Sequence, residues 1–191
     1  MNVKMTTIMK NQILLILMMT LSLTANCQFR LTSEGFVDTK DKDNKYIVLY
    51  FPDLTQSQIS SRVNLLLSSM SISPKDRISK VDSSLIVINE FCEKCIFEQA
   101  YYDMNYNIQF RFKPGKVRIE SPTFELIASR DNHVKVVLVT RDALDLLTIG
   151  IYNKSGKLKY PQFINTIETY FNDYIQQLAE SINKNSEDEN W

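Results

Sequence analysis

Hydrophobic and polar residues alternate most regularly in residues 104–120, MNYNIQFRFKPGKVRIE. From Met104 to Phe112 every second residue is apolar, a period that gives a β-strand one apolar and one polar face. The alternation resumes after Pro114-Gly115, where Val117 and Ile119 are apolar. The pattern predicts an antiparallel hairpin, and because a hairpin alone is only marginally stable in water, other elements must cover its apolar side.

The chain before the hairpin predicts a strand followed by a helix. Residues 46–51, YIVLYF, are apolar throughout and favour a central strand buried on at least one face. Thr55 and Gln58 have the spacing of a capping box, so a helix begins at Thr55. Its apolar stripe falls at Ile59, Val63, Leu66 and Met70.

The remaining well-patterned segments add strands and a final helix. Residues 77–81 and 85–91 predict two strands, and residues 124–127 predict a third beyond a bend at Pro122. Residues 163–182 have the periodicity of an amphipathic helix. Its apolar positions are Ile164, Ile167, Phe171, Tyr174, Leu178 and Ile182.

Three other segments are less regular. Residues 28–44 have few apolar positions and predict an N-terminal tether, while residues 184–191 predict an acidic tail. Residues 129–160 predict an insertion or irregular segment within a single domain spanning residues 45–183. This segment would hold a strand at 134–139, a short helix at 142–147 and a turn at 153–156.

The predicted order is β-α-β-β-β-β-α, and one antiparallel sheet with both helices on the same face gives an α+β fold. The stretches YIVLYFPDL, TQSQISSRVNLLLSSM and DRISKVDSSLIVINEF, with the PGK hairpin and the last helix, resemble a bacterial exported domain of unknown function with a TATA-box-binding-protein-like (TBP-like) fold. The resemblance covers about residues 46–127 and the final helix. It implies a TBP-like fold and an exported setting, and it brings no known catalytic residue.

The N-terminus has the pattern of an export signal. Lys4 and Lys10 precede the apolar residues 13–25, a run of the length of a signal peptide that is short for a membrane span. Residues 1–27 are therefore predicted to be removed by cleavage after Cys27. Two alternatives are a mature chain that begins with a lipid-carrying Cys27, and a retained membrane anchor. We expect an exported protein that is periplasmic, associated with the outer membrane or secreted.

Composition and charge limit the classes of partner and cofactor that this protein could bind. The 191 residues are 44% hydrophobic and carry 22 basic and 22 acidic residues, so there is no basic excess of the kind that nucleic-acid binding requires. The four glycines form neither GxGxxG nor GxxxxGK[ST]. We therefore expect no nucleic-acid partner and no cofactor.

Cys92 and Cys95 form a CxxC motif. In an exported protein a structural disulfide is favoured, while free or transiently metal-bound thiols and redox catalysis are alternatives. Redox cysteines usually follow a strand and begin a helix, whereas this motif lies between two predicted strands. In a fully extended segment the two side chains would point to opposite faces and would need a turn to bond.

The sequence gives only weak evidence for other catalytic or metal-binding residues. His133 is the single histidine, so neither a zinc site nor a histidine-dependent triad can be assembled around it convincingly. Asp142 and Asp145 have helical spacing but are predicted to be solvated. No catalytic residue and no metal ligand are assigned.

The hairpin tip is basic and also lies close in sequence to three tyrosines. A solvated face and contact with an anionic envelope partner are both open, whereas a base-stacking surface is disfavoured because the strand period places Tyr106 opposite Arg111. The basic residues are Arg111, Lys113, Lys116 and Arg118, and the tyrosines are Tyr101, Tyr102 and Tyr106.

The sequence as a whole predicts a non-catalytic ligand- or protein-binding module that uses its sheet or residues 129–160. The alternative is a small thiol–disulfide oxidoreductase that uses the CxxC motif.

Overall fold

The computed structural model describes residues 28–70, 77–140 and 147–184, so the predicted signal peptide and residues 185–191 of the predicted tail lie outside it. The described residues form two β-sheets and two long helices. In chain order the elements are β1 (Phe29–Thr32), β2 (Gly35–Asp38), β3 (Tyr46–Tyr50), α2 (Gln56–Met70), β4 (Ile78–Asp82), β5 (Leu85–Glu98), β6 (Ala100–Lys113), β7 (Lys116–Glu120), β8 (Thr123–Ala128), β9 (Asp131–Val139), β10 (Thr148–Tyr152) and α4 (Gln162–Lys184).

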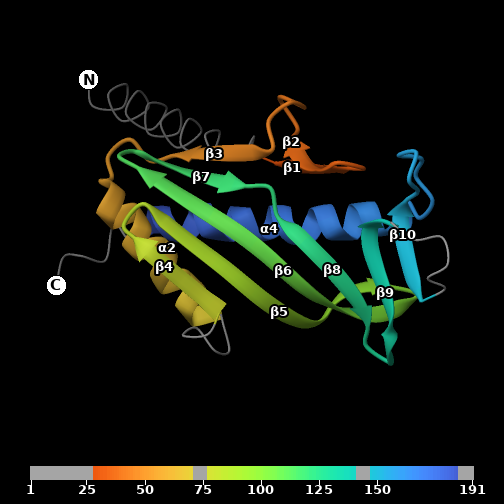
Figure 1. The fold of residues 1–191 in the computed structure, drawn as a ribbon. Coiled ribbons are helices and arrows are strands. Elements are labelled where there is room, and N and C mark those ends of the chain that lie inside the picture. The colour runs from red at the N-terminus through yellow and green to blue at the C-terminus, as the bar shows by residue number, and fades with distance from the viewer. Residues whose placement is uncertain (1–27, 71–76, 141–146, 185–191) are drawn as a thin grey trace, which may run out of the picture.

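The long strand β6 runs through the middle of the main sheet, and its two ends pair with different neighbours (Figure 1). β5 pairs with β6 along one side. On the other side, β7 pairs with residues 110–113 and β8 pairs with residues 102–107. The break at Pro122 between β7 and β8 agrees with the predicted bend. The sheet order is β10-β9-β8-β6-β5-β4, with β7 pairing both β6 and β3.

The apolar side of the β6–β7 hairpin is buried against the two helices, which lie on one face of the sheet (Figure 1). This confirms the predicted α+β architecture. The predicted alternation is also confirmed, because every apolar position of the hairpin is buried while its partners in between are more exposed. The buried positions are Met104, Tyr106, Ile108, Phe110, Phe112, Val117 and Ile119.

The capping box at the start of α2 is present. The Thr55 backbone N–H donates to Oε1 of Gln58 at 2.9 Å, and the Gln58 backbone N–H donates to Oγ1 of Thr55 at 3.3 Å. These two bonds satisfy backbone donors that a helix N-terminus otherwise leaves without partners. The predicted start of this helix is therefore confirmed.

The apolar stripe of α4 is confirmed, whereas that of α2 is shifted at its end. Ile59 and Val63 are buried as predicted, but Leu67 is the next buried position, while Leu66 is only partly buried and Met70 is 45% exposed. A spacing of four residues keeps 59, 63 and 67 on one side of the helix. In α4 the predicted positions from Ile167 to Ile182 are buried and Ile164 is partly buried.

The predicted tether at residues 28–44 is wrong, because β1 and β2 form a hairpin that packs against α4. The Phe29 backbone N–H donates to Oδ1 of Asn172 at 2.9 Å, and the Leu31 N–H donates to Oε1 of Glu168 at 2.7 Å. Phe36 is fully buried, with its ring centroid 5.1 Å from that of Phe171. The apolar residues Phe29, Leu31, Phe36 and Val37 of this segment are thus core residues, while most of its charges lie in the loop that follows β2.

The prediction of an insertion or irregular segment at residues 129–160 is also wrong, since β9 and β10 extend the main sheet as a parallel pair. The strand predicted at 134–139 is confirmed within β9, and the turn at 153–156 is confirmed by a bond from the Gly156 N–H to the Asn153 oxygen at 2.9 Å. Residues 142–146 of the predicted short helix lie outside the described residues. In the described part of the chain, neither helix has the length and hydropathy to cross a bilayer.

Candidate functional site

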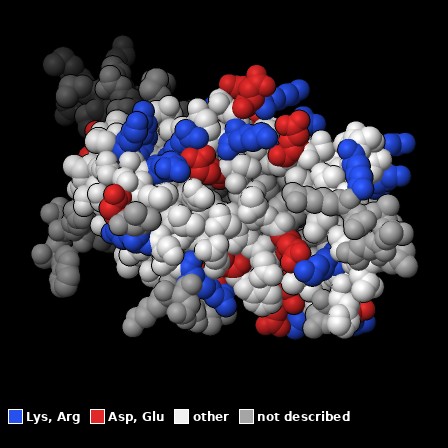
Figure 2. Space-filling view, viewed as in Figure 1, with Lys and Arg blue, Asp and Glu red and all other residues white. Residues whose placement is uncertain are grey.

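The face of the main sheet that points away from α2 and α4, called the open face below, carries mostly polar side chains. Along β6 it presents Asn105, Asn107 and Arg111, which alternate with buried core residues. Figure 2 views this face and shows Lys and Arg side chains gathered over β3 and β7 at one end. The helices cover the opposite face of the sheet, so the open face is a solvent-facing surface.

Four cations, called the basic patch, occupy the β6–β7 end of the open face: Arg111, Lys113, Lys116 and Arg118. The strand register places Arg111 directly opposite Arg118 and Lys113 directly opposite Lys116. Like charges in such cross-strand positions destabilise a sheet. Glu120 offsets part of this repulsion, because its carboxylate accepts from Nε of Arg111 and from Nη2 of Arg118, each at 3.0 Å. Neither lysine has an ion pair with another described residue, so the patch keeps a net positive charge.

Two tyrosines of β3 lie beside the basic patch. β3 pairs with β7 alone among the described strands, so it is an edge strand and not the predicted central one. The guanidinium carbon of Arg118 is 3.6 Å from the ring centroid of Tyr46, and Tyr50 is 69% exposed. Together with the basic patch they line a hollow of about 660 Å³. Neither tyrosine was predicted as a site residue, because YIVLYF has the pattern of a uniformly apolar run.

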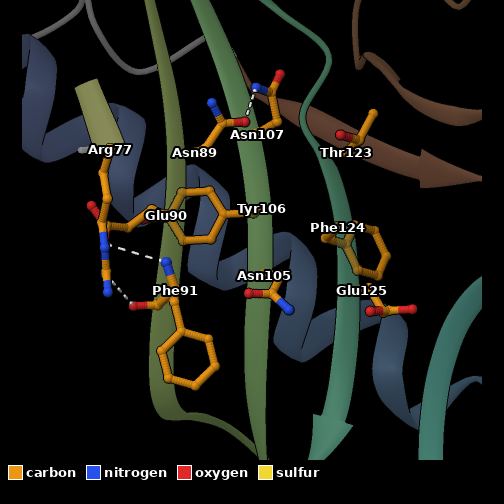
Figure 3. Close-up of a pocket in the computed structure, with 10 residues that line it drawn as sticks. All are labelled: Arg77, Asn89, Glu90, Phe91, Asn105, Tyr106, Asn107, Thr123, Phe124 and Glu125. Atoms are coloured by element: carbon orange, nitrogen blue, oxygen red, sulfur yellow. Dashed lines mark hydrogen bonds and ion pairs between the residues drawn. The ribbon is translucent and has the colours of Figure 1, made fainter. Parts of the chain in front are cut away.

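A polar hollow of about 450 Å³ lies farther along the open face, where β5, β6 and β8 meet (Figure 3). The side-chain amide of Asn107 donates to the Asn89 side-chain oxygen at 2.8 Å and to the Ile88 backbone oxygen at 3.0 Å. At its rim Arg77 forms an ion pair with Glu90 and donates to the Phe91 oxygen at 3.2 Å. The hollow thus presents the side-chain amides of Asn89, Asn105 and Asn107 on the same face as the basic patch.

The CxxC motif does not lie between two strands, as predicted, but in a bulge inside β5. Cys92 lies opposite Met104 and Ile96 lies opposite Tyr102, so three residues of β5 face one residue of β6. Lys94 takes a left-handed backbone conformation with φ of 52°. Asp103, the residue of β6 at the bulge, accepts from the Lys94 N–H at 2.8 Å and from the Ser129 hydroxyl at 2.6 Å, and this holds the bulge in place.

The bulge supplies the turn that brings the two thiols together. The Cys95 thiol donates to the Cys92 carbonyl oxygen at 3.4 Å, and both cysteines are free thiols in the structure. Hydrogen bonds from Cys95 and from the Tyr170 hydroxyl lower the pKa of Cys92 to about 7, against burial and the charges of Glu90 and Asp103. The Cys92 partner and burial raise the pKa of Cys95. The predicted disulfide stays a prediction.

The other candidate residues do not assemble into a site. His133 is exposed, and its backbone N–H donates to Oδ1 of Asp131 at 3.1 Å. Cys27, Asp142 and Asp145 lie outside the described residues. Across the described part of the chain, no three residues of the types His, Cys, Asp and Glu are grouped in a way that could hold a metal ion.

Comparisons with known proteins bear on the fold. No family model matches the sequence, and no curated protein matches it. Among solved structures, a TBP-like protein from Parabacteroides distasonis superimposes with a TM-score of 0.52 at 10% identity, covering 72% of this chain and 90% of that one. A DUF4468 family protein from Bacteroides ovatus gives a TM-score of 0.45 at 19% identity, covering 72% and 84%. The first likeness shows that the fold is TBP-like, as the resemblance implied.

Proposed function

We propose that this protein is an exported binding module that holds an acidic segment of a partner protein against the basic patch and the tyrosines of β3. The observation that carries the proposal is the pairing of Arg111 with Arg118 and of Lys113 with Lys116 on a solvent-facing sheet. Residues that lower the stability of a sheet without improving its packing are commonly retained for a function. Here that function is attraction of negative charge.

The composition of the patch favours a polypeptide partner. Tyrosine and arginine are enriched among the residues that dominate protein–protein interfaces, and this end of the open face combines two of each. Tyr50 has a largely exposed ring, and the polar hollow farther along the same face supplies amides for backbone groups of a bound segment. Complementary charge would steer the encounter, and the aromatic contacts would hold the complex.

A nucleic-acid partner fits the patch less well. Single-strand binders stack bases on exposed aromatic rings. In this patch the Arg118 guanidinium already lies over one face of the Tyr46 ring, which leaves Tyr50 as the more accessible platform. The chain as a whole is formally neutral and lacks the positive charge that draws in a polyphosphate.

The test is titration of the full chain with poly-L-glutamate at low ionic strength. The variant Lys113→Glu/Lys116→Glu should lower the affinity at least tenfold, a change of about 1.4 kcal/mol in binding free energy. Lys157→Glu/Lys159→Glu is the matched control, because both lysines are exposed beyond β10 at the other end of the sheet and the net charge changes equally. The control should bind almost as the unchanged protein does.

A third variant tests the direction of the effect. Glu120→Gln removes the carboxylate that pairs with Arg111 and Arg118, so it should strengthen binding of poly-L-glutamate. Equal losses in the patch and control variants would refute the proposal. Tighter binding of a single-stranded oligonucleotide or of anionic lipid vesicles than of poly-L-glutamate would replace the acidic polypeptide by another class of partner.

A further inference from the structure

The Cys92 thiol faces a second cavity, distinct from the open face. Cys92 lies on the same side of β5 as the buried Ile86 and Ile88, toward the helices. A cavity of about 360 Å³ lies there, beneath the edge of the sheet and between α2 and α4. Apolar and aromatic residues form most of its lining, together with Cys92 and two glutamates. They are Leu67, Met70, Ile78, Ile88, Phe91, Tyr106, Tyr170 and Tyr174, with Glu90 and Glu93.

Three features of the geometry together suit thiol chemistry. The bulge places Cys95 three residues away on a left-handed turn, so both thiols meet at one point of the strand. Cys92 is only partly buried and lines the cavity, so a small reagent that enters the cavity would meet it. A structural disulfide would need none of the cavity, whereas an exchange reaction needs room for a second disulfide beside the attacking sulfur.

We propose that Cys92 and Cys95 are a redox-active pair that exchanges with low-molecular-weight disulfides carrying an apolar or aromatic group. The Cys92 thiolate attacks one sulfur of the small disulfide, forming a mixed disulfide and releasing the other half as a thiolate. Cys95 then loses its proton and attacks the Cys92 sulfur, releasing the second half as a thiolate. Each released thiolate is in equilibrium with its thiol, so the small disulfide is reduced to two thiols while the pair is oxidised to an intramolecular disulfide.

Cys92 is the attacking member because its surroundings favour the thiolate near neutral pH. The Cys95 thiol and the Tyr170 hydroxyl donate to it and lower its pKa, while the pKa of Tyr170 itself is raised and keeps that hydroxyl protonated. A thiol with a pKa near the ambient pH is close to the optimum for attack. The other titratable groups that face it from the elements around the cavity are Glu90 and Glu93 of β5, Asp103 and Tyr106 of β6, and Tyr174 of α4.

The experiment uses the full chain with Cys27→Ser, so that Cys92 and Cys95 are the only thiols. The reduced protein is mixed with 4,4′-dithiodipyridine, a neutral aromatic disulfide. Two equivalents of pyridinethione should be released, and the protein should end lighter by two hydrogens with no adduct. The added Cys95→Ser should stop the reaction at one adduct on Cys92, and Cys92→Ser should react at least tenfold more slowly.

A positioning variant separates this role from a merely structural one. Tyr170→Phe keeps the ring but removes the donor to Cys92, so the midpoint of the pH–rate profile should move upward from about 7. Tyr102→Phe is the matched control, because Tyr102 packs against Phe163, outside the Cys92 cavity, and should leave the midpoint unchanged. Two stable adducts on the unchanged pair, equal rates for the two serine variants, or a midpoint near the ordinary value of 9.0 would overturn the proposal.

Discussion

Arg62 shows how a charged residue can belong to the core of this fold. It lies on α2 with 7% of its surface exposed, and its guanidinium donates to the Ile182 carbonyl oxygen at 2.7 Å. Ile182 is in the last turn of α4, where carbonyl groups have no partner within the helix and a positive charge is favourable. Arg62 therefore joins the two helices at a point where apolar contact alone would leave a buried acceptor.

The first prediction concerns this link. Arg62→Met keeps much of the side-chain volume but removes the donor, so the free energy of unfolding should fall by about 1–3 kcal/mol. Urea denaturation followed by circular dichroism measures the change. Arg30→Met is the matched control because Arg30 is exposed on β1, and it should change stability by no more than about 0.5 kcal/mol. Equal effects of the two variants would show that the Ile182 contact contributes nothing.

Some residues of the candidate sites could be predicted from the sequence, and others could not. The basic patch could be predicted because its residues alternate with apolar ones in a regular hairpin. The approach of Cys95 to Cys92 could not, because it depends on a left-handed conformation at Lys94, a residue type that gives no signal for that conformation. The tyrosines of β3 carried a signal in the alternation of Tyr46, Val48 and Tyr50 with buried neighbours.

Among the elements, the β1–β2 hairpin shows where sequence patterns were insufficient. Its strands have four residues each, so the alternation is too short to stand out beside the charged loop at residues 39–45. The hydrogen bonds between β1 and α4 join residues 143 and 137 positions apart in the sequence, and they depend on the side chains of Asn172 and Glu168. By contrast, β6, β7 and α4 were predictable because each has a long or strongly periodic pattern.

The second prediction tests whether this hairpin is part of the core. Phe36→Ala removes a ring packed against Phe29, Phe124 and Phe171, so the free energy of unfolding should fall by about 3–5 kcal/mol. Phe97→Ala is the matched control. Phe97 is 58% exposed and pairs only with Tyr101 among the described aromatic rings, so its loss should be at most about 1.5 kcal/mol. A Phe36 variant as stable as the unchanged protein would restore the interpretation of this segment as a tether.

For binding of an acidic partner, the distribution of charge over the molecule matters more than its net charge. The chain carries equal numbers of acidic and basic residues, yet one end of the open face holds four cations and a single carboxylate. Attraction at such a surface weakens as salt rises, because the screening length falls from about 10 Å at 0.1 M to about 3 Å at 1 M. Binding of an acidic partner should therefore fall steeply with ionic strength.

The third prediction concerns export of the molecule. If residues 1–27 are a signal peptide, the protein recovered from its native compartment should have 191 − 27 = 164 residues and begin at Gln28. Intact-mass measurement distinguishes this outcome from the alternatives, since a lipid-carrying Cys27 would add one residue and the mass of its acyl chains. A full-length mass in the cytoplasm would contradict the exported setting.

The fourth prediction locates the binding surface by NMR, with the isotope-labelled protein titrated with poly-L-glutamate. Amide shift changes should concentrate in β3, β7 and the β7 end of β6, and they should be absent from α4 and from the Cys92 cavity. The same titration of Lys113→Glu/Lys116→Glu should leave those amides unmoved. Shift changes centred on the helices or on β9 and β10, or persisting in the double variant, would contradict the assignment of the open face as the binding site.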